Sequence, residues 1–203
     1  MRAVIIGNGS IYDYEYIKSC LRDDDHIICA DGGACHAQAM GITADVLIGD
    51  FDSLPHGAES AARVIEYPSR KDFTDGELCV DYAVEHGFSD VLLIGMTGSR
   101  LDHTINNIFL LFKCKSGRLI DEHNEIFAFD GRLEIKNRRG KTLSIIPVDG
   151  DIEGITTSGL EYPLDNETLY FGRARGNSNV IVYDGALITA EKGRGIVIVG
   201  NGE

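Results

Sequence analysis

Short apolar runs alternate with stretches of helical spacing through about the first 125 residues of the chain. The apolar runs are each only a few residues long and lie at residues 3–6, 26–30, 45–48, 63–67 and 90–94. Apolar side chains recur at helical spacing in the stretches at residues 34–40, 74–86 and 102–115. Short apolar runs separated by helices are typical of parallel strands that are covered on both faces. We therefore expect an open α/β sheet in this part of the chain.

The pattern changes after about residue 125. Segments such as "KTLSIIPVDG", "ETLYFG" and "NVIVYDG" are short, rich in β-forming residues and closed by Gly or Asp. Turn signals recur roughly every 8–12 residues, which is typical of a β-sandwich or a barrel. We expect no helix in this part. The sequence therefore predicts two domains, an α/β domain at residues 1–124 and an all-β sandwich domain at residues 125–203.

Composition and charge argue against some classes of partner and indicate where in the cell the protein is found. The chain has 203 residues and a formal net charge of −13, whereas a nucleic-acid-binding protein normally has a basic face, so we expect no nucleic-acid partner. The N-terminal apolar run is too short for a signal peptide, and no stretch approaches the ~18 apolar residues of a membrane span. The five cysteines contain no C-x-x-C pair, and most of them fit buried small hydrophobes. We expect a reduced, cytoplasmic protein with no membrane partner.

Polar residues gather directly after the predicted strands. These strands run in turn into "GNGS", "DGGA", "GDFDS", "PSRKDFTD" and "GMTGSRLDH". Ligands of open α/β sheets bind beyond the carboxyl ends of the strands, so one crevice could collect the charged residues of all these segments. The charged residues concerned are Asp31, Asp50, Asp52, Asp72, Asp75, Arg100 and Asp102.

Asp50 and Asp52 are two like charges at the end of a predicted buried strand. If the backbone stays extended there, both side chains point the same way, and the carboxylates repel each other unless a cation lies between them. Oxygen ligands without a nearby His or Cys favour Mg²⁺ over zinc. A solvated Asp-x-Asp turn explains this pair equally well.

The neighbouring motifs also have structural explanations. The stretch from Thr74 to Glu77 fits a T-x-x-E capping box, and Ser99 with Asp102 has the S-x-x-D spacing that opens a helix. A helix N-terminus also binds anions, so capping and phosphate binding are compatible. Arg100 could contact a phosphate through its forked guanidinium. These residues alone predict an acidic, Mg²⁺-dependent site for a phosphorylated ligand.

The order and spacing of "ADGGA", "IGDFDS", "KDFTDGE" and "GSRLDHTINNI" resemble thiamine pyrophosphokinases. The later "TTSGLEYPL" and "FGRARGNSN" are similar to that family's thiamine-binding half, so the resemblance covers essentially the whole chain. It implies an open, Rossmann-like ATP-binding domain with flanking helices, then a β-sandwich domain, in a homodimer that binds thiamine where the two chains meet. The implied reaction moves the diphosphate group of ATP to the thiamine hydroxyl, which gives thiamine diphosphate and AMP.

By motif, the resemblance also assigns roles to residues. Asp50, Asp52 and Asp75 would hold Mg²⁺, with Asp72 and Lys71 completing the catalytic set and Lys71 touching phosphate. The ATP-binding residues would be Asp31, Gly32, Arg100, Asp102, His103 and Asn106. Thiamine contacts would come from Tyr162, Ser178 and Asn179. Arg173 and Arg175 hold the product diphosphate or, more simply, are surface charges.

Three other functions remain open on the sequence. A strand that ends in D-x-D also resembles haloacid-dehalogenase-type phosphatases, but that pattern prefers Thr or Val where Ser53 stands and leaves "SRLDH" unexplained. A pyrophosphokinase of the same fold could act on another hydroxymethyl heterocycle, such as a pterin. A non-catalytic nucleotide-binding sensor is the third possibility, and the intact acidic residues argue against it.

Overall fold

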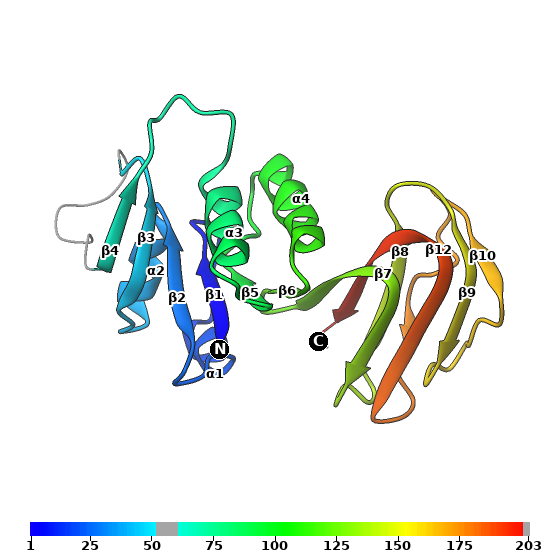
Figure 1. The fold of residues 1–203 in the computed structure, drawn as a ribbon. Coiled ribbons are helices and arrows are strands. Elements are labelled where there is room, and N and C mark those ends of the chain that lie inside the picture. The colour runs from blue at the N-terminus through cyan, green and yellow to red at the C-terminus, as the bar shows by residue number, and fades with distance from the viewer. Residues whose placement is uncertain (52–60, 201–203) are drawn as a thin grey trace. The chain divides into compact units, whose positions relative to one another are not determined.

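The protein is described by a computed structural model for residues 1–51 and 61–200 (Figure 1). The chain divides into two compact units, Met1–Glu122 (unit 1) and His123–Glu203 (unit 2). Unit 1 contains helices and strands, whereas the described residues of unit 2 contain strands and no α-helix. The mixed α/β architecture predicted from the sequence is therefore confirmed.

The described residues of unit 1 form strands that pair in parallel in the order β4-β3-β2-β1-β5-β6. The strands are β1 (Arg2–Ile6), β2 (His26–Ala30), β3 (Ala44–Gly49), β4 (Ala61–Glu66), β5 (Asp90–Ile94) and β6 (Ser116–Ile120). The helices are α1 (Tyr14–Ser19), α2 (Gly33–Ala39), α3 (Asp75–Glu85) and α4 (Leu101–Phe109), and a 3₁₀ helix, η1 (Leu110–Lys113), follows α4.

The core of unit 1 forms where helices pack on the apolar strands. Ile17 of α1 and Ala37 of α2 join buried side chains of β1, β2, β3 and β5 in one cluster. Cys79, Val80 and Ala83 of α3 are also buried. β1 is buried along its whole length, as expected for a parallel strand that is covered on both faces.

Unit 1 differs from the prediction at several elements. β4 was expected to be covered on both faces. Among the described residues it pairs with β3 alone, and its side chains are exposed or half-buried, including Val64 at 50%. That expectation is wrong because β4 is the last strand in the order and carries charged residues. The predicted helix at residues 102–115 ends at Phe109 and continues as η1. Helix α1 and strand β6 were not predicted from the sequence.

The apolar stripe of α4 faces away from the core. Leu101, Ile105 and Phe109 follow one another at four-residue spacing and are 67%, 43% and 44% exposed. No residue of α4 itself is buried, and the chain reaches the core only at Leu110 and Leu111 of η1. Unit 1 therefore has an amphipathic helix whose apolar face is not covered by the described residues of unit 1.

Unit 2 is antiparallel in all its described strand pairs and is organised around one long strand. Its strands are β7 (Asn124–Lys136), β8 (Thr142–Pro147), β9 (Ile152–Ser158), β10 (Glu167–Leu169), β11 (Asn179–Val180) and β12 (Gly185–Gly200). The first part of β12 pairs with β7 and β9, and its last part pairs with β7 and β8. Alternating residues of these strands, such as Ile135, Ile145 and Val197, form one buried apolar cluster.

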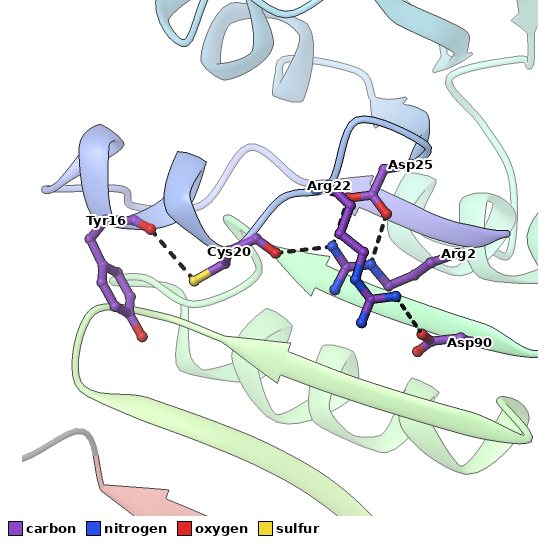
Figure 2. A network of polar contacts seen from close by, with 6 residues as sticks. All are labelled: Arg2, Tyr16, Cys20, Arg22, Asp25 and Asp90. Atoms are coloured by element: carbon purple, nitrogen blue, oxygen red, sulfur yellow. Dashed lines mark hydrogen bonds and ion pairs between the residues drawn. The ribbon is translucent and has the colours of Figure 1, made fainter. Parts of the chain in front are cut away.

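A buried ion pair fixes the edge of unit 1 where β1 and β5 begin (Figure 2). The Arg2 guanidinium donates two hydrogen bonds to the Asp25 carboxylate, from Nε at 2.9 Å and from Nη2 at 2.6 Å, and both side chains are 1% exposed. The Cys20 carbonyl accepts from Arg2 at 3.0 Å, and the Arg22 backbone N–H donates to Asp25 at 2.7 Å. Burial by itself raises the pKa of Asp25, but these hydrogen bonds outweigh it and hold the pKa below its usual value.

Replacing Arg2 by Met should strongly destabilise the protein, because it leaves the Asp25 carboxylate buried without its partner. We expect the free energy of unfolding, measured by urea denaturation at pH 7, to fall by about 3–5 kcal/mol. Because the folded-state pKa of Asp25 is lowered, the pair stabilises the protein above about pH 4 and loses this effect as the pH falls further. The difference between wild type and variant should therefore shrink in acid.

Asp90→Asn is the matched control for Arg2→Met. It breaks only the 3.7 Å pair between Arg22 and Asp90, whose side chains are 57% and 40% exposed. An exposed pair of this kind contributes at most about 1 kcal/mol. Equal losses in the two variants would contradict the special role assigned to the buried pair.

Candidate active site

A cavity of about 560 Å³ lies where the parallel strands of unit 1 end. Its walls come from the loops that follow β1, β2, β3 and β5, from the segment that leads into α3, and from one side of α4. The strands bring these loops together because Ile6, the last residue of β1, pairs with Cys29 of β2 and Ile94 of β5. The cavity is therefore at the position expected for a ligand site in a parallel sheet.

The loops after β1 and β5 are joined by backbone hydrogen bonds along the cavity wall. Gly7 N donates to Ile94 O at 2.9 Å, and Ser10 N donates to Thr97 O at 2.7 Å. Between these bonds, Gly9 approaches so closely that a Cβ atom there would lie 2.3 Å from Thr97 O. Only glycine permits this contact, which explains part of the "GNGS" sequence.

Asp31 is the most constrained acid of the cavity. Its backbone adopts a left-handed conformation with φ of 43°, and its N–H donates to Ile48 O at 2.8 Å. The Oδ1 atom is buried and has no hydrogen-bond partner in the described residues. Burial raises the pKa of Asp31, and the negative charges of Asp75 and Asp50 raise it further. Three carboxylates thus share a cavity in which one buried oxygen has no hydrogen-bond partner among the described residues.

Lys71 provides a positive charge beside this group of carboxylates. Its Nζ atom lies 2.7 Å from an oxygen of Asp75, and the Lys71 side chain is only 12% exposed. Asp75 is the first residue of α3, and the Thr74 side chain caps this helix by accepting from Glu77 N at 3.1 Å. The predicted N-cap role of Thr74 is confirmed, and the same turn places Asp75 in the cavity wall.

Arg100 and Asp102 form a forked ion pair at the start of α4. Nε and Nη2 of Arg100 lie 3.0 Å and 2.6 Å from the two carboxylate oxygens, and both side chains are more than 60% exposed. Hydrogen bonding from Arg100 lowers the pKa of Asp102. The prediction that Ser99 opens the helix is wrong, because Arg100 is the N-cap residue and makes no side-chain capping bond.

The structure brings together some of the residues that the sequence assigned to ATP, metal and catalysis. Those in the cavity wall are Asp31, Asp50, Lys71, Asp75, Arg100 and His103. Gly32 is buried and does not line the cavity, and Asp72, Asp102 and Asn106 are exposed and do not line it either. Asp52 lies outside the described residues. Within the described ranges, no group of three or more His, Cys, Asp or Glu side chains is placed to hold a metal ion.

Sequence reasoning missed the polar residues on the inner side of α4. Asn107 lines the cavity and donates from Nδ2 to Met96 O at 2.9 Å, whereas its predicted neighbour Asn106 points to solvent. Thr104 accepts from Gly98 N at 3.2 Å. Helical periodicity from His103 is the signal that predicts this face, because positions four residues apart lie on the same side of a helix.

A second cavity of about 230 Å³ lies in unit 2 and includes two of the three residues assigned to thiamine. Tyr162 and Asn179 line it together with apolar side chains such as Leu143 and Ile145, but Ser178 does not line it. The Asn179 side chain holds the Tyr162 backbone, because Oδ1 accepts from Tyr162 N at 3.1 Å and Nδ2 donates to Tyr162 O at 2.7 Å. The Tyr162 side chain itself is 66% exposed.

Arg175 also lines this second cavity and forms an ion pair with Glu167. Ser178 has a left-handed backbone with φ of 58°, and its N–H donates to Ser144 Oγ at 3.0 Å. The tight turn at Ser178 therefore positions Asn179 through the backbone.

The cysteines are free, as the sequence predicts. Burial raises the pKa of the Cys29 thiol to about 12, and it also raises the pKa of Cys79 well above its usual value. These thiols stay protonated near neutral pH and pack as small apolar side chains. Among the helices in residues 1–51 and 61–200, none combines the length and apolar character that a membrane crossing requires.

Comparison with known proteins identifies both units. Residues 17–122 match the catalytic domain of thiamin pyrophosphokinase, and residues 132–194 match its vitamin B1 binding domain. The thiamine pyrophosphokinase of Bacillus subtilis (strain 168) is 34% identical over 188 residues, which cover 86% of this chain and 88% of that protein. Thiamine pyrophosphokinase 1 of Oryza sativa subsp. japonica is 25% identical and covers 81% of this chain and 75% of its own.

Solved structures agree with the sequence matches. The crystal structure of thiamine pyrophosphokinase from Bacillus subtilis superposes with a TM-score of 0.89 and 27% identity, and the match covers 100% of both chains. The thiamin pyrophosphokinase of Geobacillus thermodenitrificans superposes with a TM-score of 0.86 and 26% identity over 100% of this chain and 99% of that one. With family models matching both units, this chain belongs to the thiamine pyrophosphokinase family.

Proposed function

We propose that the cavity of unit 1 is where this enzyme binds ATP before transferring its diphosphate group to the hydroxyl of thiamine. One observation carries the proposal: the cavity brings together three carboxylates and two positively charged side chains. It lies in unit 1, which matches the family's catalytic domain. The charged side chains are Asp31, Asp50, Asp75, Lys71 and Arg100. Phosphoryl-type transfer depends on positioning and charge neutralisation, and this set of side chains supplies both.

The carboxylates fit a hard divalent cation such as Mg²⁺. The buried Oδ1 of Asp31 lacks a partner in the described residues, and the nearby acids offer oxygen ligands only. We propose that Asp50, Asp52 and Asp75 hold Mg²⁺, while Asp31 shapes the site beside them. The bound cation would neutralise phosphate charge and orient the diphosphate for attack.

The reaction requires attack at the β-phosphorus of ATP. A bond forms between the thiamine hydroxyl oxygen and the β-phosphorus, and the bond from that phosphorus to the oxygen bridging to the α-phosphate breaks. The products are thiamine diphosphate and AMP. We propose that Lys71 and Arg100 bind phosphate oxygens, with His103 and the inner side of α4 holding the rest of the nucleotide.

We propose that the second cavity contributes to thiamine binding. Its aromatic Tyr162 and apolar walls suit a heterocycle, and an exposed aromatic face attracts the cationic thiazolium ring. Asn179 already uses three hydrogen bonds within the protein, two of them to Tyr162 and one from Val180 N. Its main role in this proposal is therefore to hold the Tyr162 segment. The roles predicted for Ser178, Arg173 and Arg175 remain predictions.

The finer domain assignment is also a proposal. The division between Glu122 and His123, together with the family matches at residues 17–122 and 132–194, supports a Rossmann-like ATP-binding domain at 1–124 and a thiamine-binding β-sandwich at 125–203. Free cysteines are compatible with the cytoplasmic location predicted from the sequence. The pterin enzyme and the sensor are not favoured, because the second unit matches a vitamin B1 binding domain.

A mass-resolved assay with purified protein, thiamine, ATP and Mg²⁺ tests the reaction directly. Thiamine diphosphate together with AMP is the expected result, and EDTA should abolish both products. Thiamine monophosphate together with ADP would contradict attack at the β-phosphorus. Product formation that persists in EDTA would contradict the metal requirement.

Asp52→Asn should reduce the rate at saturating ATP and thiamine at least ~100-fold, because it removes one preorganised charge from the proposed metal site. Single-turnover kinetics would measure the loss. Asp24→Asn removes the same charge from an exposed position outside the cavity and serves as the control. Near-normal turnover of Asp52→Asn would remove Asp52 from the metal role.

Lys71→Met should increase the affinity of the ATP-free protein for a divalent cation. The Lys71 ammonium pairs with Asp75 and competes with a second positive charge, so its removal should strengthen Mn²⁺ binding about tenfold, measured by electron paramagnetic resonance. Turnover should fall at the same time, because a phosphate contact is lost. Lys71→Arg keeps the charge and should bind Mn²⁺ like the wild type. Equal Mn²⁺ affinity of Lys71→Met and wild type would argue against the pairing.

We propose that the enzyme is a homodimer and that the exposed stripe of α4 takes part in its interface. Three apolar side chains on one helix face are otherwise left in water. Ile105→Glu should shift the dimer toward monomer in sedimentation equilibrium, because the new charge would be desolvated in the interface. Val64→Glu, at a comparably exposed apolar side chain of β4, is the control. An Ile105→Glu protein that remains dimeric would place the interface elsewhere.

A further inference from the structure

His36 connects helix α2 to the wall of the nucleotide cavity. Its Nε2 atom lies 2.8 Å from the carbonyl oxygen of Gly9, and its Nδ1 atom lies 2.7 Å from the hydroxyl of Tyr14. A carbonyl oxygen can only accept, so Nε2 must carry a hydrogen. In the neutral ring Nδ1 then accepts from the Tyr14 hydroxyl. The partners thus determine which ring nitrogen bears the proton.

The peptide group that His36 contacts is held from both sides. Its carbonyl belongs to Gly9 and accepts from His36, while its N–H belongs to Ser10 and donates to Thr97 O at 2.7 Å. Gly9 N additionally donates to Gly95 O at 2.6 Å. Gly9, Ser10 and Thr97 all line the cavity, whereas His36 does not. His36 therefore acts on the cavity only through this peptide.

Tyr14 is itself well anchored at the start of α1. The Glu122 carboxylate accepts from the N–H groups of Tyr12 and Asp13 at 2.6 Å and 3.0 Å. The Asp13 side chain caps α1 by accepting from Tyr16 N at 2.9 Å. The Tyr14 and His36 rings lie 5.7 Å apart between centroids, and both side chains are partly buried. The support for His36 is therefore fixed in place by a capped helix.

We propose that His36, supported by Tyr14, is a positioning residue for ATP. It fixes the Gly9–Ser10 peptide against the loop after β5 and so sets the shape of the cavity wall that faces the nucleotide. The motifs that resemble the family do not include His36, since the nearest one ends at Ala34. The inference rests on the assignment of this cavity to ATP.

His36→Leu removes both hydrogen bonds, and His36→Gln restores one of them, because its amide N–H can still donate to Gly9 O. Each neutral hydrogen bond accounts for roughly fivefold in affinity, so His36→Leu should weaken binding of a non-hydrolysable ATP analogue with Mg²⁺ about five- to tenfold. The KM for ATP should rise by the same factor, while the KM for thiamine stays within about twofold. His36→Gln should recover most of the loss.

Tyr14→Phe provides a second, milder variant in case His36→Leu folds poorly. It leaves the Tyr14 ring in place but removes the hydroxyl that hydrogen-bonds to His36, so analogue binding should weaken by roughly two- to fivefold. Gln38→Ala changes an exposed side chain of the same helix and should bind like the wild type. Thermal unfolding of every variant establishes that the compared proteins are folded.

Arg100→Ala removes a charged side chain from the cavity wall. Analogue binding by this variant shows whether a negative result concerns only His36 or also the assignment of the cavity to ATP. Weaker analogue binding in His36→Leu with recovery in His36→Gln supports the positioning role, whatever Arg100→Ala shows. Unchanged binding in folded His36→Leu and Tyr14→Phe overturns it. If Arg100→Ala alone weakens binding, the cavity binds ATP and only the role of His36 fails. If neither Arg100→Ala nor His36→Leu has an effect, the ATP assignment fails as well.

Discussion

The parallel pairing of β1 between β2 and β5 determines where each group of the proposed active site lies. All three strands end at the same edge, so the loops that begin at Gly7, Asp31 and Gly95 meet there. β1 is apolar and buried along its length, so polar groups can lie only at its two ends. The sheet thus separates a charged edge where the strands begin from a charged edge where they end.

The pKa values of Asp25 and Asp31, one at each edge, are shifted in opposite directions. Where the strands begin, Asp25 receives two hydrogen bonds from Arg2, and its pKa is lowered despite burial. Where they end, burial and neighbouring carboxylates raise the pKa of Asp31, and one of its oxygens lacks a partner in the described chain. The first arrangement stabilises the fold at neutral pH. The second keeps negative charge in a partly buried position, which is unfavourable, and a bound cation would offset this cost. Groups with shifted pKa values are concentrated at functional sites.

The sequence predicts the parts of the molecule that depend on local pattern. Apolar runs predict β1 and β5, and the T-x-x-E spacing predicts the cap at Thr74, because these features involve neighbouring residues. Helical spacing from His103 also indicates Asn107 rather than Asn106 as a residue of the cavity wall. The sequence fails where distant residues determine a contact. The contact of His36 with Gly9 joins positions 27 residues apart and has no local signal. The S-x-x-D spacing also gave a wrong prediction at Ser99, because the helix begins after Arg100 and has no side-chain cap.

Helix α4 combines two roles that follow from its amphipathic sequence. Its polar side places His103, Thr104 and Asn107 in the cavity wall, while its apolar side leaves Leu101 and Ile105 exposed. Because no residue of α4 is buried, the chain that follows it supplies the nearest anchor in the core, at Leu110. A partner that covers the apolar side would therefore also restrain the polar side. In the proposed dimer, assembly and nucleotide binding would stabilise the same conformation of α4, so each would favour the other.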